Sequence, residues 1–205
     1  MKTKDQSINL KILQCAKSEF MDKGFADASM RRIAEKAGVT TGMLYSRFAD
    51  KEEIFAELVR DGADKLYGFF MNAQNAFAAF PPEKQHSEMH SYVDKEMDVM
   101  IDIIYDNFDA FKLIICKSGG SRYHDYVDKM VEVETKNTKR FIECLRESGV
   151  KINNVRADLS HMLSSAMFNG VFEVVAHDLP KEDAVVYIGQ LMEFFNVGWD
   201  KLLGL

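Results

Sequence analysis

The sequence of 205 residues has little proline, little cysteine and no long uninterrupted apolar run. It contains only three prolines, two of them adjacent at Pro81–Pro82, so long stretches with a 3.6-residue apolar period can continue as helices. No window reaches the roughly 18 consecutive apolar residues that a membrane span needs, and no apolar segment typical of a secretory signal follows Met1. These absences predict an all-α, cytoplasmic protein without a membrane partner.

Residues that could carry enzyme chemistry are few and scattered. Cys15, Cys116 and Cys144 form no CxxC pair, which is typical of reduced thiols in a cytosolic protein. His86 and His90 are four residues apart, but no third ligand is evident nearby, so we expect no metal site. We find no nucleophile paired with a base and no phosphate-binding loop. The sequence therefore predicts neither an enzyme nor a bound cofactor.

The net charge of −6 conceals a strong asymmetry between the two ends of the chain. Residues 1–51 contain ten Lys or Arg and six Asp or Glu, whereas the remainder contains 16 basic and 26 acidic residues. A basic N-terminal part joined to an acidic body is expected when only one end of a protein meets phosphate. The charge distribution is therefore compatible with nucleic-acid binding by the N-terminal part alone.

Apolar periodicity and helix-ending residues predict nine helices. Gly24, Gly38 and Gly149 each follow a helical stretch, where a left-handed residue commonly ends a helix. Residues 150–155 are briefly strand-like, and we interpret them as a loop between helices. The expected helices are 7–23, 30–36, 40–49, 51–80, 83–105, 108–117, 122–148, 156–177 and 181–203.

The segment 29–51 has the pattern of a helix-turn-helix motif. In its second helix Leu44 and Phe48 are four residues apart and are expected to point inward. Thr41, Gly42 and Tyr45 are expected to point the opposite way. Small outward groups let a short helix enter a major groove about 12 Å wide, where its N-terminal residues reach base edges.

Residues 8–55 resemble the N-terminal domain of the TetR family of transcriptional regulators. The resemblance keeps one register over these residues, including the spacing between helices. It is carried by Ile12-Leu13-x-x-Ala16-x-x-x-Phe20-x-x-x-Gly24-Phe25, by Ile33-Ala34-x-x-Ala37-Gly38-Val39 and by Gly42-x-Leu44-Tyr45-x-x-Phe48-x-x-Lys51. It implies a nine-helix architecture with a three-helix DNA-binding head, and domains at 1–52 (DNA binding) and 53–205 (ligand binding and dimerisation).

The resemblance also implies DNA contacts at matching positions. The residues expected at backbone phosphates are Ser29, Arg31, Thr40, Tyr45 and Lys51. Thr41 and Gly42 are expected at base edges. Two positions depart from the family pattern: Ser46 replaces a frequent aromatic residue and Arg47 replaces a frequent His. Arg47 is long enough to add a phosphate or guanine contact, so the operator sequence cannot be taken from a relative.

Beyond about residue 56 the resemblance is one of architecture only, and it implies an effector pocket and a dimer interface. This half is rich in Phe and Met, which suit either a well-filled helical core or a pocket for a small apolar or aromatic effector. The expected pocket walls are Phe69, Met100, Ile104, Tyr123, Tyr126 and Phe168. The expected homodimer interface, on the last two helices, contains Ala166, Gly170, Val174, Ile188, Leu191 and Phe195.

Two functions remain open at this point. The first is a repressor that binds palindromic double-stranded operator DNA as a homodimer and is released by a small molecule. The alternative is a DNA-bound adaptor of the same fold that recruits a protein partner without a small-molecule effector, for which an exposed apolar patch would be expected. The sequence does not determine the effector, the operator, the regulated genes or whether transcription is repressed or activated.

Overall fold

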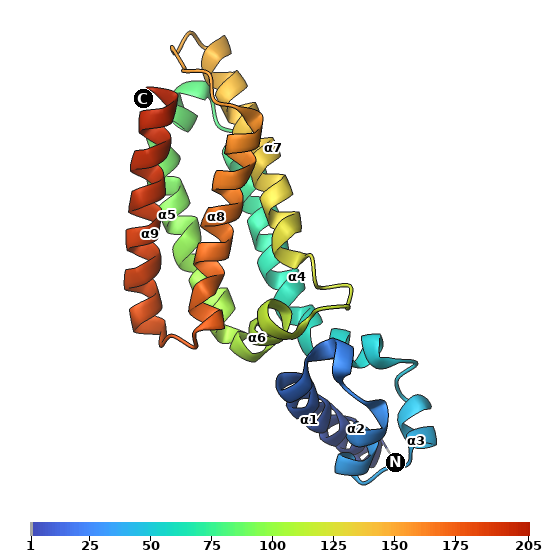
Figure 1. Cartoon of the computed structure of the whole chain (residues 1–205). Helices are drawn as coiled ribbons and strands as arrows, with labels where there is room; N and C mark the ends of the chain where they lie inside the picture. The colour runs from blue at the N-terminus through green and yellow to red at the C-terminus, as the bar shows by residue number, and fades with distance from the viewer. Residues whose placement is uncertain (1) are drawn as a thin grey trace. The chain divides into compact units, whose positions relative to one another are not determined.

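The computed structural model describes residues 2–205, with side chains described from residue 6 onward. Over these residues the chain forms nine α-helices and no β-strand, which confirms the predicted all-α class (Figure 1). The helices are α1 (Lys2–Asp27), α2 (Met30–Ala37), α3 (Thr41–Tyr45), α4 (Lys51–Ala78), α5 (Pro82–Asp106), α6 (Phe108–Lys117), α7 (Tyr126–Glu147), α8 (Ala157–Ala176) and α9 (Lys181–Leu203).

Most helix ends lie within two residues of the predicted ones, and the exceptions are at α1, α3 and α7. Helix α3 ends at Tyr45, four residues before the predicted end, and is followed by a turn in which the Arg47 amide donates to the Leu44 carbonyl at 3.1 Å. Helix α1 begins at Lys2 rather than at Ser7. Gly24 interrupts α1 with φ 73° and ψ 168°, and a further turn then continues to Asp27, beyond the predicted end. Helix α7 begins at Tyr126 rather than at Arg122. Residues 121–125 instead form turns, in which the Ser121 amide donates to the Ser118 carbonyl at 2.8 Å and the His124 ring contacts the Ser121 carbonyl at 2.7 Å. Such local hydrogen bonds compete with helix formation.

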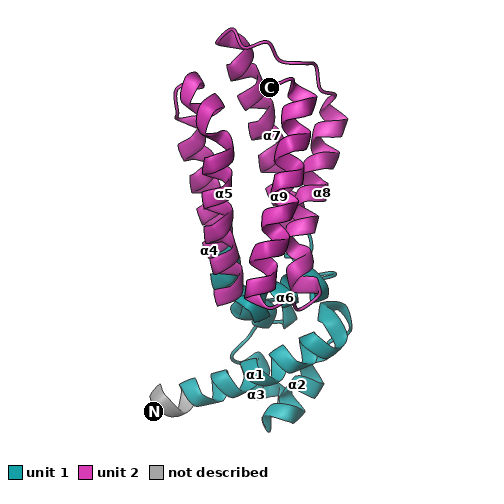
Figure 2. Cartoon of the chain, turned by 90° about the vertical axis from the view of Figure 1, so that its left-hand side faces the viewer, with its two compact units in different colours: residues 1–64, 107–125 teal, residues 65–106, 126–205 magenta. Residues whose placement is uncertain are grey.

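The chain divides into two compact units (Figure 2). The first comprises the described residues up to Asp64 together with Asn107–Asp125, and the second comprises Lys65–Asp106 and Tyr126–Leu205. The expected boundary after residue 52 therefore does not coincide with the boundary between these units. The reason is that the first turns of α4 complete the core of the head: Phe55 is fully buried and its ring lies 5.1 Å from that of Phe20.

The second unit is a helical bundle built from the remainder of α4 with α5, α7, α8 and α9. Figure 1 shows α5, α8 and α9 running alongside one another. The small residue Gly170 on α8 faces Leu191 on α9, where a Cβ atom would lie 2.9 Å from Leu191 Cδ2. The side chains of Phe168, Val174 and Ile188 are buried in this unit, so α8 and α9 each direct one apolar face into the bundle.

Candidate functional site

A tight turn joins α2 to α3 within the first unit. Ser29 caps α2, and its hydroxyl accepts a hydrogen bond from the Arg32 amide at 3.4 Å. Gly38 ends the helix in the left-handed conformation (φ 67°, ψ 33°), which glycine adopts without strain. Thr40 is extended and caps α3, because its hydroxyl accepts from the Met43 amide at 3.1 Å. These local bonds fix the start of α3.

Helix α3 has one buried side and one exposed side. Leu44 is fully buried and Phe48 is 6% exposed, whereas Tyr45 is 52% exposed. Thr41 is exposed as well, and a Cβ atom at Gly42 would meet no atom within 4 Å. The inward and outward assignments made from the sequence are therefore confirmed. The outward side has the small, polar character that a major groove accommodates.

The remaining predicted DNA contacts differ in their surroundings. Arg31 and Thr40 are exposed, and Ser29 is half-buried at its cap. Arg47 donates through Nη1 to Asn9 Oδ1 at 2.6 Å, and it is thereby tied to α1. Lys51 Nζ donates to the carbonyl oxygens of Ala26 at 2.8 Å and Ala28 at 3.3 Å. In this structure both basic groups stabilise the head, and their contacts with DNA stay predictions.

Two residues near this surface had no role in the sequence-based prediction. Met43 lies on α3 beside the outward residues and is 38% exposed, which makes its thioether chain available to a thymine methyl group. Glu19 lies on α1 and is only 1% exposed. The sequence could have indicated this burial. Glu19 is three residues after Ala16 and one before Phe20, which places a carboxylate on the apolar, buried stripe of the helix.

Glu19 links α1 to α2 through three hydrogen bonds. Its carboxylate accepts from Arg32 Nε at 2.6 Å, from Lys36 Nζ at 3.0 Å and from the Ser29 amide at 3.3 Å. Burial acts to raise the pKa of Glu19, but the hydrogen bonds from Arg32, Lys36 and Ser29 outweigh it and hold the pKa below its ordinary value. The carboxylate therefore fixes α2, the helix that precedes α3.

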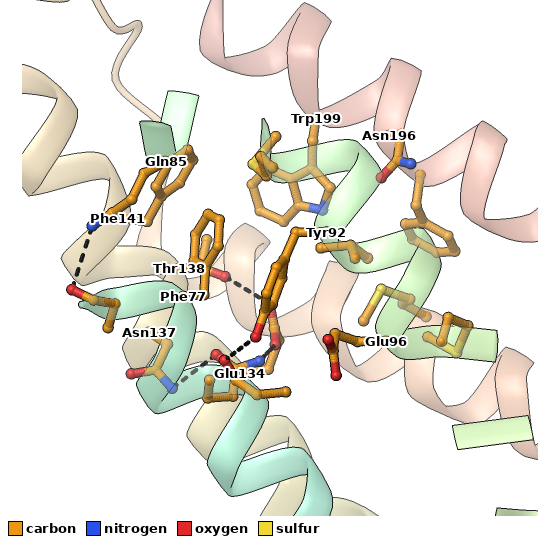
Figure 3. A pocket seen from close by; sticks show the side chains of 18 of the residues that line it. Phe77, Gln85, Tyr92, Glu96, Glu134, Asn137, Thr138, Phe141, Asn196 and Trp199 are labelled. Atoms are coloured by element: carbon orange, nitrogen blue, oxygen red, sulfur yellow. Dashed lines mark hydrogen bonds between the residues drawn. The ribbon is translucent and has the colours of Figure 1, made fainter. Parts of the chain in front are cut away.

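The second unit contains a partly open cavity of about 350 Å³ (Figure 3). Its walls come from α4, α5, α7, α8 and α9 and are mainly aromatic and thioether side chains. Residues on these walls include Phe70, Phe77, Met89, Tyr92, Met97, Met100, Phe141, Met167, Phe168, Phe195 and Trp199. A volume of this size is within the range of small-molecule pockets.

Of the six predicted pocket residues, only Met100 and Phe168 line this cavity. Helix rotation excludes Phe69, because the next residue, Phe70, is the one that faces Phe168, with ring centroids 5.5 Å apart. The other three predicted side chains do not line the cavity because they pack against other residues. Ile104 is fully buried in the core, Tyr123 contacts Phe55 in the first unit, and Tyr126 contacts Tyr67.

One wall of the cavity is polar. Glu134 on α7 accepts a hydrogen bond from Gln74 Nε2 at 2.7 Å and another from Thr138 Oγ1 at 3.2 Å. Asn137 Nδ2 in turn donates to Gln74 Oε1 at 3.0 Å. Burial raises the pKa of Glu134, and the bonds from Thr138 and Gln74 oppose this rise only in part. Sequence reasoning missed this wall because a single Glu on a long, highly charged helix is usually solvated.

The predicted dimer residues do not form one exposed surface. Val174, Ile188 and Phe195 are buried within their own unit, and Gly170 with Leu191 forms a contact between α8 and α9. Of the six, only Ala166 is exposed. The exposed apolar side chains of these helices lie at other helical positions: Met162, Val185, Val186, Phe194 and Val197. The predicted helices expose apolar surface, but on other faces than expected.

The part of the chain that the structure describes contains neither a metal cluster nor a membrane-spanning helix. No cluster of three or more His, Cys, Asp or Glu side chains there could hold a metal ion. His90, expected to be a surface residue, contacts both carboxylate oxygens of Asp200 at 3.0 Å. Among these residues no helix combines the length and the apolar character needed to cross a bilayer.

Comparison with known proteins identifies the N-terminal segment. Residues 12–58 match the family described as bacterial regulatory proteins, tetR family. The HTH-type transcriptional repressor KstR2 of Mycolicibacterium smegmatis is 37% identical over 73 residues, which cover 36% of this chain and 35% of that protein. The matches to such curated relatives thus span about a third of their length.

Solved structures of similar fold cover nearly the whole chain. The TetR family transcriptional regulator PfmR from Thermus thermophilus has a TM-score of 0.55 at 21% identity, over 89% of this chain and 97% of that chain. The transcriptional regulator FadR from Bacillus subtilis, solved with stearoyl-CoA, has a TM-score of 0.53 at 15% identity, over 91% of this chain and 96% of that chain. These regulators are transcription factors rather than enzymes, in agreement with the prediction from sequence. The chain therefore carries the helix-turn-helix domain of the TetR family of transcriptional regulators, followed by a helical body of the fold found in that family.

Proposed function

We propose that this protein is a transcriptional repressor that binds palindromic operator DNA as a homodimer and is released by a small molecule. The observation that carries the proposal is the outward side of α3, where Thr41, Gly42 and Tyr45 are exposed above the buried Leu44. This helix lies in the segment that matches the family. The Mycolicibacterium smegmatis relative is a transcriptional repressor, which favours repression over activation.

On the DNA side, we propose that α3 enters the major groove with Thr41 and Gly42 towards the bases. Tyr45 would donate its hydroxyl to a phosphate oxygen, and Arg31, Thr40 and Ser29 would contact the backbone near the start of each helix. Lys51 already donates to two carbonyl oxygens, and we propose that it shares its remaining N–H group with a phosphate. Arg47 would reach DNA only by leaving Asn9.

The dimer is proposed from the exposed apolar faces of α8 and α9. Phe194 is 72% exposed, and Val186 and Val197 are 61% and 64% exposed on the same helix. Large apolar side chains gathered on neighbouring helices commonly mark an interaction surface. A second copy of the chain would bury them in a two-fold symmetric four-helix interface, which matches the symmetry of a palindromic site.

Release by a ligand is proposed to depend on α4. This helix contributes residues 51–64 to the first unit and residues 65–78 to the second, where Phe70, Gln74 and Phe77 line the cavity. A ligand that binds two positions of α4 with different affinity would shift the equilibrium between them. A coupling of about 1–3 kcal/mol is typical of such regulation.

The first experiment is a fluorescence-anisotropy titration of the full chain against duplex DNA from the region upstream of its own gene, at two salt concentrations. We expect binding that outcompetes random duplex and weakens as salt rises. Binding no tighter than to random duplex, at that region and at genome-selected fragments, would contradict the proposal. Sequence-specific binding that no small molecule releases would instead favour the adaptor function.

A further inference from the structure

We propose that the cavity of the second unit takes a lipophilic cation: a ligand with a protonated amine or quaternary ammonium group on an aromatic or aliphatic body. This inference rests on the proposed function, since it gives the chemical class of the effector. It is carried by two carboxyl groups, Glu96 and Glu134, that face an apolar cavity without an ion-pair partner among the described residues.

The two carboxyl groups come from different helices and line the same cavity as the ring of Tyr92. Glu134 projects from α7, and Glu96 projects from α5, one turn after Tyr92. In Figure 3 both lie close to Tyr92. Burial, together with the negative charge of Glu96, raises the pKa of the Tyr92 hydroxyl, in keeping with that proximity. The cavity thus brings two acidic side chains next to its aromatic wall.

No basic side chain within the described part of the chain is paired with either carboxyl group. The donors to Glu134 are an amide and a hydroxyl, both neutral, and neither Glu96 nor Glu134 is within 4.0 Å of a Lys, Arg or His nitrogen among the described residues. Arg140 also lines the cavity, but its side chain is exposed and forms no ion pair there. Each carboxylate oxygen has two lone pairs, so Glu134 can accept further donors besides Gln74 and Thr138. A ligand cation would supply both the donors and the missing positive charge.

The remaining walls suit the body of such a ligand. Phe77, Phe141 and Trp199 surround the cavity with Tyr92, and Figure 3 shows these rings above the Glu134 carboxyl group. Aromatic faces attract cations and also bury apolar groups. A free fatty acid or another anion would meet the negative charge of Glu96 and would favour the protonated form of Glu134, whose pKa burial already raises, so neither group would attract it. A neutral apolar ligand would leave Glu96 without a counter-charge, whereas a cation would favour the ionised form of Glu134 against the effect of burial.

The test uses three probes with one body and different heads: 4-phenylbutylamine, 4-phenylbutanol and 4-phenylbutanoate. Trp199 is the only tryptophan of the chain and lines the cavity, so its fluorescence reports binding to the full-length protein without DNA. We expect the amine to bind about tenfold or more tightly than the alcohol, as charge-assisted hydrogen bonds allow, and the acid to bind weakest. The variants are Glu134→Gln and Glu96→Gln, and the matched control is Glu132→Gln, an exposed position on the same helix as Glu134.

Each glutamine variant of the cavity is expected to lose about tenfold in amine affinity while its affinity for the alcohol changes less than about twofold. Retained alcohol binding shows that the variant is folded, and Glu132→Gln should behave as the wild type. Equal affinity for the three probes, tighter binding of the acid, or no amine binding at millimolar concentration would overturn the proposal. If the amine binds as expected but leaves the DNA complex intact, the ligand class stands and the release step of the proposed function fails.

Discussion

Replacement of Glu19 by Gln is expected to loosen the DNA-binding head without unfolding the body. The glutamine keeps the shape of the side chain but removes its charge, so the strong bonds from Arg32 and Lys36 are lost or weakened. Breaking a fully buried ion pair costs roughly 3–5 kcal/mol. Here the basic partners are 48% and 47% exposed and can be solvated, so we expect about 1–3 kcal/mol.

The effect of pH follows from the lowered pKa of Glu19. A carboxylate with a lower pKa in the folded state stabilises the protein above its unfolded pKa, here about 4.5, and this stabilisation is lost as pH falls through the lower folded value. The wild-type head should therefore lose stability below about pH 4.5. The variant should be less stable than the wild type at pH 7, and the difference should shrink as the wild-type carboxylate becomes protonated.

Hydrogen exchange resolved by peptide is the suitable assay, because it separates the two units. At pH 7 we expect amides in residues 12–38 of the variant to lose about 5- to 150-fold in protection, while peptides around Trp199 in the second unit keep theirs. Asp22→Asn is the control, since Asp22 is on the same helix with its side chain 62% exposed. Unchanged protection in Glu19→Gln, or an equal loss in the control, would refute the assigned role of Glu19.

Four further substitutions test other parts of the molecule. Tyr45→Phe should weaken operator binding by about 5- to 30-fold while ligand affinity of the free protein stays unchanged, measured by anisotropy and Trp199 fluorescence; equal losses in both would contradict the separation of roles. Gly38→Ala should destabilise the head by about 1–2 kcal/mol in urea titrations, because φ is 67° at this position. Gly42→Ala has open space at its Cβ atom, so it should leave the stability of the head unchanged in the same titrations and weaken only DNA binding. Phe194→Asp should convert a dimer into a monomer in analytical ultracentrifugation. Because this side chain is 72% exposed, the unfolding midpoint of the dilute monomer should stay nearly unchanged. An unaltered dimer would exclude this face as the dimer interface.

The sequence by itself determined the helices and the geometry of the helix-turn-helix. Gly38 needed a left-handed turn, and Thr40 supplied a cap from its own side chain, so both signals act within a few residues of the chain. The alternation of Leu44 with Tyr45 also fixed the buried and exposed sides of α3, because one face of a short helix has only one core to contact.

Only the tertiary structure decided which neighbours those helices meet. One residue along a helix turns the side chain by about 100°, so Phe70 rather than Phe69 faces the cavity, and Phe194 rather than Phe195 faces solvent. Glu134 and Gln74 are far apart in sequence, and no periodicity places their side chains in contact. Apolar spacing shows that a helix has a buried face, but the partner of that face depends on how helices distant in sequence pack together. The cavity and the exposed apolar surface could therefore be found only from the fold.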